Sequence, residues 1–293
     1  MSRQPEIALF TVVHSASQPY LQSFLGSVAE QTHQDFELFL INDGLDETAL
    51  RKSLCRLPVP SRVLSISSTI AKNRELGLKE VIRHGFRLVA LADSDDVLHS
   101  RRMELAISEL QTRSALFHDI TLIDEEGEIL EKNRWSNRLS SGDLIDREFL
   151  VEKNCLGFGN VSFRTEILPD FWSLPQDLQV VDWYFFYRFL DCCAAFCVEG
   201  ATMYRQHNAS LIGAEIPNEY NLTRRLGQVE RHYGSLMADF PSLSRELKRV
   251  RDFRNSVVNR PGYFSSVNSI LSDPEWERAL FWWEDIDLLM SQK

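Results

Sequence analysis

Three carboxylates stand together in the run Asp93-Ser94-Asp95-Asp96, directly after an apolar stretch at residues 88–92. An apolar run of that length is typical of a buried parallel strand. Residues just beyond the carboxyl end of such a strand lie in the crevice where open α/β sheets bind ligands. Three neighbouring acids repel one another, and a divalent cation that prefers oxygen ligands, Mg²⁺ or Mn²⁺, would neutralise them. The alternative is a solvated acidic turn that caps the next helix.

The elements that must position this run alternate along the first half of the chain. Apolar runs predict four buried strands, at residues 7–13, 36–41, 62–66 and 86–92. The stretches between them predict helices, including one at 71–84 that Gly85 ends in the left-handed conformation. Alternation of this kind indicates an α/β fold with a doubly wound, mostly parallel sheet.

The pattern changes in the second half of the chain. Residues 116–123 and 128–130 flank the turn Glu125-Glu126-Gly127 and predict a hairpin. The stretch 180–190 is apolar nearly all round, as in a buried helix. Further short strands are expected at 161–163, 195–198 and 201–204.

Composition limits the classes of function. The chain has 293 residues, of which 44% are hydrophobic, and a formal net charge of -10. This balance argues against a nucleic-acid-binding protein, which would show a basic face. An anionic ligand must therefore be held by a local cation or by helix N-termini. No stretch reaches the length of a transmembrane helix. Five cysteines without a zinc-binding spacing indicate reduced thiols in a cytosolic setting.

Six short motifs follow one another in a recognisable order. They are a leucine-rich helix ending in Gln31-Thr32, then Asn42-Asp43-Gly44, Ala71-Lys72-Asn73-Arg74, Asp93-Ser94-Asp95-Asp96, Val181-Asp182-Trp183 and Tyr204-Arg205-Gln206-His207. With them the chain resembles, over residues 5–213, the family 2 glycosyltransferases of the GT-A nucleotide-sugar fold. The resemblance implies a metal-dependent, inverting transfer of a sugar from a nucleoside diphosphate sugar to an acceptor hydroxyl.

The resemblance also implies a role for each side chain that would bind the donor. Asp43 would meet the nucleobase, and acceptance of a base N–H would favour uracil or thymine. Asp93 would face the ribose. Lys72 would bind the diphosphate, and Arg205 belongs to the motif that closes the donor site.

The same resemblance implies the metal ligands and the base. Asp95 would ligate Mn²⁺ or Mg²⁺, with Asp96 as a further ligand or as its support. His207 would be a third contact to the metal or the diphosphate. Asp182 would be the general base that takes the proton of the acceptor hydroxyl.

Several of these residues also have a plainer interpretation. Asp43 would be a turn residue before Gly44, and His207 a structural histidine. Asp182 would be a helix cap, because the helix dipole favours a negative charge at that end. Lys72 has no such explanation, since cations are disfavoured at a helix start and anions are attracted there.

The sequence departs from the family's pattern in places. Val13-His14-Ser15-Ala16 stands where Pro-Thr-Tyr-Asn is usual, and Val181 replaces a Glu beside the expected base. These departures motivate an alternative hypothesis, a degenerate member that binds nucleotide sugar or a partner without turnover. A third hypothesis is a phosphatase of the haloacid dehalogenase type. Its Asp-x-Asp follows the first strand, whereas here the motif follows the fourth.

The expected organisation is a glycosyltransferase domain at 1–213 and a helical extension at 214–293. The extension has an apolar face made by Phe281-Trp282-Trp283, Ile286, Leu289 and Met290. The acids between them argue against an anionic membrane surface. Docking of this face on the chain's own catalytic domain is the first hypothesis, and a homodimer contact is the second.

The resemblance implies two substrates. The expected donor is a UDP- or dTDP-linked sugar, and the expected acceptor is a carbohydrate or a lipid-linked carbohydrate. The family often builds surface polysaccharide or lipopolysaccharide. We therefore expect the protein in the cytoplasm or, as a peripheral protein, at the inner face of the membrane.

Overall fold

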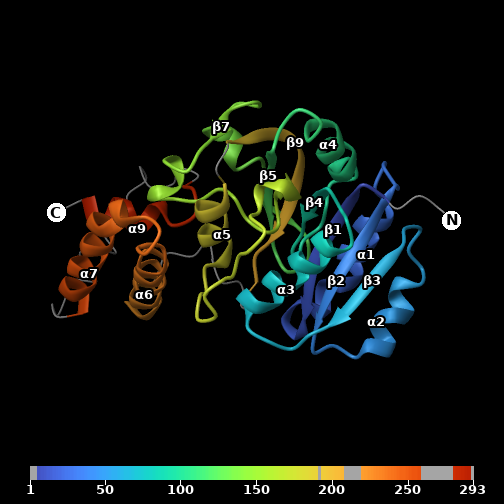
Figure 1. Ribbon diagram of the computed structural model, residues 1–293, viewed down its shortest axis with the longest axis horizontal. Helices are drawn as coiled ribbons and strands as arrows, with labels where there is room; N and C mark the ends of the chain where they lie inside the picture. The colour runs from blue at the N-terminus through green and yellow to red at the C-terminus, as the bar shows by residue number, and fades with distance from the viewer. Residues whose placement is uncertain (1–4, 191–192, 208–218, 259–279, 292–293) are drawn as a thin grey trace.

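The computed structural model describes residues 5–190, 193–207, 219–258 and 280–291, and a mixed β-sheet forms its centre (Figure 1). The order of the strands is β3-β2-β1-β4-β8-β5-β9-β7, and β6 pairs with β5 outside this path. The strands are β1 (Ile7–His14), β2 (Phe36–Asp43), β3 (Ser61–Ser65), β4 (Leu88–Leu91), β5 (Ala115–Ile123), β6 (Ile129–Glu131), β7 (Leu144–Ile145), β8 (Val161–Arg164) and β9 (Ala194–Arg205).

Helices cover the sheet, and further helices lie beyond it on one side. The α-helices are α1 (Leu21–Ala29), α2 (Glu47–Leu54), α3 (Ile70–Arg83), α4 (Arg102–Glu109), α5 (Val181–Phe189), α6 (Glu219–Leu236), α7 (Ser244–Val258) and α9 (Glu284–Ser291). Short 3-10 turns are η1 (Ser15–Tyr20), η2 (Trp135–Asn137), η3 (Phe149–Val151), η4 (Thr165–Ile167) and η5 (Pro241–Leu243).

The first half of the chain forms the predicted doubly wound arrangement. β1 pairs in parallel with both β2 and β4, and β2 pairs in parallel with β3. Alternate residues of β1 point to opposite faces, so that Phe10 joins one apolar cluster and Leu9 the other. Gly77 of α3 lies directly on this sheet, because a Cβ there would come within 2.3 Å of the Phe10 ring. Gly85 ends α3 with φ +81°, as predicted.

The second half adds antiparallel and parallel strands to the same sheet. β8 is antiparallel to β4 and β5, and β9 is parallel to β5. The predicted hairpin is confirmed by the pairing of β5 with β6. The prediction of two strands at 195–198 and 201–204 was wrong, because β9 is continuous through Gly200. That glycine has φ +73°, next to an irregular register between His118 and Ile120.

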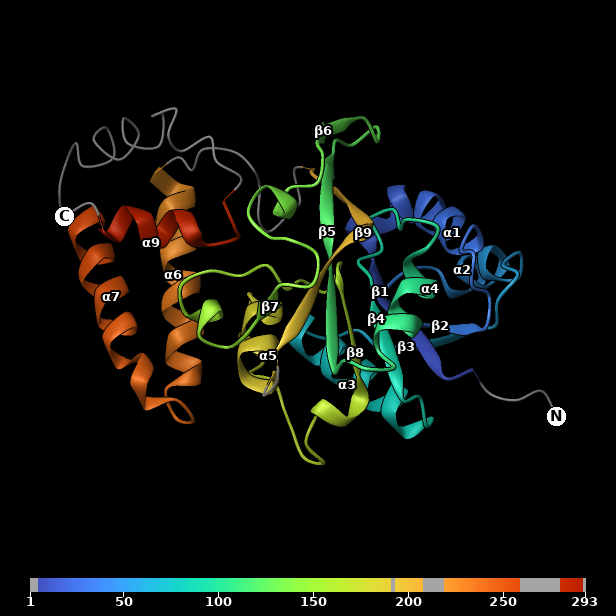
Figure 2. The same ribbon diagram turned by 90° about the horizontal axis from the view of Figure 1, so that it is seen from above.

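The helices α6, α7 and α9 lie beside α5 and away from the sheet (Figure 2). Their apolar side chains belong to the same buried cluster as α5 and one face of the sheet. Phe281, Trp283, Ile286, Leu289 and Met290 are buried in it, which is the docking on the chain's own domain that the sequence predicts. The expected domain boundary at 213/214 lies outside the described residues. Within the described part of the chain, no helix has the length and hydropathy that a membrane crossing takes.

Candidate active site

A cavity of about 350 Å³ opens at the carboxyl ends of the parallel strands. It is lined by residues from the ends of β1 and β2, the first turn of α3, the acidic loop after β4 and the end of β9. Six of the side chains predicted from the sequence line it: Asp43, Asp93, Asp95, Asp96, Arg205 and His207. Segments far apart in the chain thus meet at the sheet edge where α/β proteins bind ligands.

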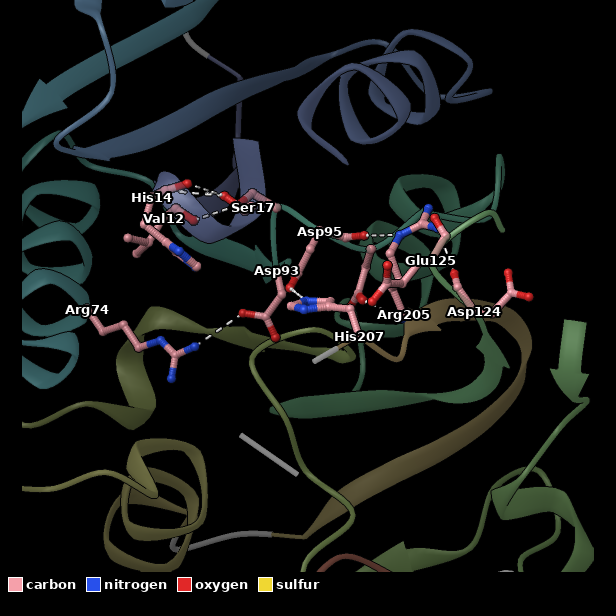
Figure 3. A network of polar contacts seen from close by, with 12 residues as sticks. Val12, His14, Ser17, Arg74, Asp93, Asp95, Asp124, Glu125, Arg205 and His207 are labelled. Carbon is pink, nitrogen blue, oxygen red and sulfur yellow. Dashed lines mark hydrogen bonds and ion pairs between the residues drawn. The ribbon is translucent and has the colours of Figure 1, made fainter. Parts of the chain in front are cut away.

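The acidic loop and the end of β9 are joined by hydrogen bonds (Figure 3). The Nε2 atom of His207 lies 2.9 Å from Oδ2 of Asp95. The backbone N–H of Arg205 donates to Oδ1 of Asp96, also at 2.9 Å. The ring of Tyr20 lies 5.2 Å from the ring of His207, and the Arg205 guanidinium lies 4.7 Å from the Tyr20 ring. This packing holds two candidate metal ligands, Asp95 and His207, side by side.

The Arg205 guanidinium makes contacts to backbone carbonyls on both sides of the site. Its Nε donates to the Asp95 carbonyl at 2.9 Å. Its Nη1 donates to the carbonyls of Asp124 and Glu125 in the turn between β5 and β6, at 2.9 and 2.8 Å. Arg205 therefore ties the acidic loop to the hairpin, a structural task that its assignment to the donor site did not include.

Arg74 is the α3 cation that reaches the cavity, and the sequence analysis missed it. Its Nη2 donates to Oδ1 of Asp93 at 3.2 Å, and its guanidinium lies 4.2 Å from the centre of the Phe158 ring. The structure corrects the placement of Lys72, which is not among the residues that line the cavity. Lys72 Nζ instead lies 2.9 Å from Oε1 of Glu75, because positions two apart on a helix point to different faces. That spacing was the available signal.

Asp43 has two neighbours in the cavity that the sequence analysis did not include. Nδ2 of Asn73 donates to Oδ2 of Asp43 at 2.8 Å. His14 is the register partner of Asp43 at the ends of the parallel strands β1 and β2, and it also lines the cavity. Burial lowers the pKa of His14, although the carboxylate of Asp95 opposes this shift. The parallel alignment of the two strand ends was the signal for His14.

A glycine on the loop between η3 and β8 brings backbone against the carboxylates. A Cβ at Gly159 would lie 2.8 Å from Oδ2 of Asp96 and 3.2 Å from Oδ2 of Asp93. The hydroxyl of Thr202 in β9 donates to the Gly159 carbonyl at 2.8 Å. The absence of a side chain at Gly159 therefore allows the carboxylates of Asp93 and Asp96 to lie close to the backbone of this loop.

The electrostatics of the acidic loop are those of crowded, buried acids. Burial raises the pKa of Asp93 to about 6, which Asp95 and Asp182 reinforce and Arg74 opposes. Burial and the neighbouring carboxylates raise the pKa of Asp96 well above its ordinary value. Oδ2 of Asp96 is buried and has no hydrogen-bond partner among the described residues. An orphaned carboxylate oxygen of this kind favours a bound cation.

Asp182 lies in the first turn of α5, beside the cavity but not among the residues that line it. The helix cap is Val180, so the interpretation of Asp182 as the cap was wrong. Oδ1 of Asp182 accepts the backbone N–H of Trp183 at 2.8 Å. Burial raises the pKa of Asp182, and the charge of Arg74 opposes this shift. A carboxylate with a raised pKa takes up a proton more readily.

Comparisons with known proteins identify the family. The model of the family described as "Glycosyl transferase family 2" matches residues 9–172, more than half of the chain. The chain belongs to glycosyl transferase family 2. The match runs from within β1 to beyond β8, and it includes the acidic loop and the opening of α3.

Solved structures similar to this family 2 chain share its fold. TarS of S. aureus in complex with UDP-GlcNAc is 15% identical, with a TM-score of 0.58 over 94% of this chain and 79% of that chain. The mannosyltransferase PcManGT from Pyrobaculum calidifontis, in complex with GDP-Man and Mn²⁺, is 11% identical. Its TM-score is 0.61 over 99% of this chain and 86% of that chain.

Curated relatives are named as glycosyltransferases and are much longer than this chain. An uncharacterized glycosyltransferase of Rickettsia bellii is 28% identical over 133 residues, which are 44% of this chain and 19% of that protein. One from Rickettsia felis is 28% identical over 109 residues, 36% of this chain and 18% of that protein. This glycosyltransferase chain thus spans about a fifth of the length of these curated relatives.

The carboxylates of the acidic loop face different partners. Arg74 contacts Asp93, His207 contacts Asp95, and the Arg205 backbone contacts Asp96. Among the described residues, three ligand atoms converge within 4.8 Å only at Glu152, Glu246 and Asp287. There Arg249 pairs with all three acids. That cluster is therefore an ion-pair network.

Proposed function

We propose that this chain transfers a sugar from a nucleoside diphosphate sugar to an acceptor hydroxyl with inversion at the anomeric carbon. The observation that supports it most is the convergence of Asp43, Asp93, Asp95 and His207 on one cavity at the carboxyl ends of the parallel strands. Family membership supports the transfer of a glycosyl group. The inverting course and the metal are part of the proposal.

The proposed donor is a UDP- or dTDP-linked sugar. Asp43, with Asn73 donating to one of its oxygens, keeps carboxylate acceptor capacity for the N–H of a base. The similar fold of TarS holds UDP-GlcNAc, and that of PcManGT holds GDP-Man, so both base types are outcomes of the test below. Arg74, rather than Lys72, is the proposed cation near the diphosphate.

The proposed metal is Mn²⁺ or Mg²⁺, held by Asp95 and His207 with Asp96 as a further ligand or support. The donor set suits the ion, because carboxylate oxygen with imidazole nitrogen is accepted by Mn²⁺. The orphaned Oδ2 of Asp96 and the raised pKa of Asp93 fit a site that expects positive charge. When bound, such an ion stabilises the charge of the departing diphosphate as a Lewis acid.

Asp182 is the proposed base. As the acceptor oxygen forms its bond to the anomeric carbon, the acceptor proton passes to a carboxylate oxygen of Asp182. The bond from that carbon to the diphosphate oxygen breaks, and the diphosphate leaves with the electron pair. The raised pKa of Asp182 strengthens it as a proton acceptor. Arg74, whose charge acts on both Asp93 and Asp182, would keep the base ionised before transfer.

The experiment is a thermal-shift series with nucleotide sugars, with and without Mn²⁺, on the wild type and on Asp95→Ala. We expect a Mn²⁺-dependent shift with one donor, lost in Asp95→Ala and kept in Asp35→Ala, an exposed control. Unchanged Mn²⁺-dependent affinity in Asp95→Ala would contradict the metal assignment. Slow hydrolysis of the bound donor separates an enzyme from the alternative, a protein that binds nucleotide sugar without turnover.

A further inference from the structure

Trp282 belongs to a segment far along the chain and contacts Tyr204, a residue that lines the cavity. Its backbone forms an isolated bridge with Asn154, with N–H···O distances of 2.8 and 2.9 Å in the two directions. Its indole lies 5.8 Å from the ring of Tyr204 and 5.3 Å from the ring of Trp135, measured between ring centroids. Tyr204 lines the cavity, so Trp282, which is not itself a lining residue, packs against a residue of the cavity wall.

The loop Gly157-Phe158-Gly159 connects Trp282 with the reacting groups. A Cβ at Gly157 would lie 2.9 Å from Cη2 of Trp282, so the indole rests on bare backbone. The next residue, Phe158, carries the Arg74 guanidinium, and Gly159 abuts Asp93 and Asp96. Three successive residues thus contact the indole of Trp282, the guanidinium of Arg74 and the carboxylates of the acidic loop. One loop therefore links Trp282 to the donor site.

The backbone at Trp283 is strained, and this conformation sets the direction of the neighbouring Trp282 side chain. Trp283 has φ +71°, a left-handed conformation that is unusual for a bulky residue and costs free energy. The turn sends Trp283 into the core, where it is buried and stacks on Trp183 at 5.9 Å. Trp282 points the other way and stays partly exposed, whereas the other tryptophans of the described chain, Trp135, Trp172, Trp183 and Trp283, are buried.

Polar contacts hold this turn in place. Glu284 accepts the backbone N–H of Phe281 at 3.0 Å and pairs with Arg138, whose Nη2 lies 3.0 Å from its Oε1. Nη2 of Arg134 donates to the Leu280 carbonyl at 3.2 Å. A partly exposed indole on a strained, ion-paired turn is pre-organised, and such strain is typical of ligand-binding sites.

We propose that Trp282 is the wall of the acceptor subsite and stacks its indole face on the pyranose ring of a carbohydrate acceptor. The proposal rests on the proposed function. A sugar ring offers an apolar C–H face to an aromatic surface while its hydroxyls meet polar groups. Nearby carboxylates supply the polar groups, because the charges of Asp96, Asp93, Asp95 and Asp182 all act on the adjoining Tyr204.

The first test is ¹⁹F NMR of the full chain labelled with 5-fluorotryptophan, in which Trp282→Phe assigns the Trp282 resonance. The probes are the methyl glycosides of glucose, galactose, mannose and N-acetylglucosamine, added with UDP and Mn²⁺ present. We expect at least one glycoside to shift the Trp282 resonance in a saturable way. A panel in which none does so overturns the proposal.

The second test measures transfer to the glycoside that shifts the resonance. Trp282→Ala should raise its KM by about tenfold or more, and Trp282→Phe should restore most of the loss. Nucleotide affinity should stay within about twofold in both variants. Phe171→Ala removes a fully exposed aromatic that does not line the cavity, and it should change neither quantity.

These outcomes separate the two proposals. An acceptor KM that is unchanged in Trp282→Ala, or a donor affinity that falls in parallel with it, overturns the acceptor wall. Absence of nucleotide binding by the wild type overturns the proposed function. A glycoside that shifts the Trp282 resonance in that case still supports a carbohydrate subsite at Trp282.

Discussion

Asp182 illustrates at the scale of one residue how a helix and its surroundings set the chemistry of a carboxylate. It lies in the first turn of α5. Burial raises the pKa of Asp182, and the positive charge of Arg74 opposes that shift. We predict that Asp182→Asn leaves donor affinity nearly unchanged and lowers transfer by about a hundredfold or more, because only base catalysis is removed. Steady-state transfer rates and nucleotide titrations on the same preparation check both halves.

The control for this prediction is Asp177→Asn, which changes an exposed acid in the loop before α5. It should transfer at the wild-type rate. Near wild-type transfer by folded Asp182→Asn, with a loss in Asp177→Asn, would move the base to the loop. Asp191, another acid near α5, lies outside the described residues.

The candidate site was predictable where a motif stands at the end of a strand. Asp43 and Asp93 follow parallel strands, and the alignment of those strands brings them to one cavity. Lys72 was chosen and Arg74 was missed because a motif gives only residue types. The position of each residue around the helix decides which of the two cations lines the cavity, and Arg74 does. Gly159 gave no signal, since a close approach depends on elements 60 residues apart in the chain.

At the scale of elements, two distant segments clamp the start of α5. Trp183 stacks on His232 of α6 at 4.0 Å on one side and on Trp283 at 5.9 Å on the other. Its Nε1 also donates to the Leu150 carbonyl at 2.7 Å. Because Asp182 is the preceding residue, the helices of the C-terminal region support the position of the proposed base.

We predict that Trp283→Leu destabilises the fold by about 2–4 kcal/mol, since a large buried ring is lost. At temperatures where the variant stays folded, kcat should fall while nucleotide affinity holds, because Asp182 loses support and the donor cavity does not. Denaturant melts and nucleotide titrations measure the two effects.

A matched control is Trp172→Leu, which removes a buried ring that packs on Phe185 and Phe189 farther along α5. It should cost comparable stability with less effect on kcat. Equal losses of kcat in both variants, in proportion to their loss of stability, would show that the clamp acts only through stability.

Periodicity predicted most elements of the parallel half because β1, β2 and β4 are buried on both faces and contain continuous apolar runs. β9 was predicted as two pieces because Glu199-Gly200 interrupts the apolar pattern. β9 pairs with β5 on both sides of that interruption, up to His118 with Cys197 and again from Ile120 with Thr202, and the strand continues between them. Tertiary pairing, which a local pattern does not contain, decided the outcome there.

At the scale of the whole molecule, an acidic chain with a formal net charge of -10 keeps carboxylates buried in its own cavity. The folded pKa of Asp93, about 6, exceeds the ordinary 3.8, and that of Asp96 is higher than ordinary too. At these two groups the folded state therefore binds more protons than the unfolded state above about pH 4. Their contribution to stability is fully present below that pH and is lost as the pH rises through 6 and beyond.

We predict that Asp96→Asn flattens this dependence in protein kept in EDTA without nucleotide. Its Tm should exceed that of the wild type by about 3 °C or more at pH 8 and differ little at pH 4, where both side chains are neutral. Scanning calorimetry across pH 4–8 tests it. Asp35→Asn, an exposed change, should follow the wild-type curve, and a similar curve for Asp96→Asn would refute the linkage.

The stacking of Trp283 on Trp183 joins residues that leave the ribosome 100 positions apart. A growing chain that has released residues up to 207 already holds every residue that lines the cavity, but it lacks His232 and Trp283, which pack against the start of α5. We expect such a nascent chain to capture nucleotide sugar without consuming it. Activity would then begin only when the 280–291 segment emerges. The order of synthesis would in this way prevent hydrolysis of the donor by an incomplete chain.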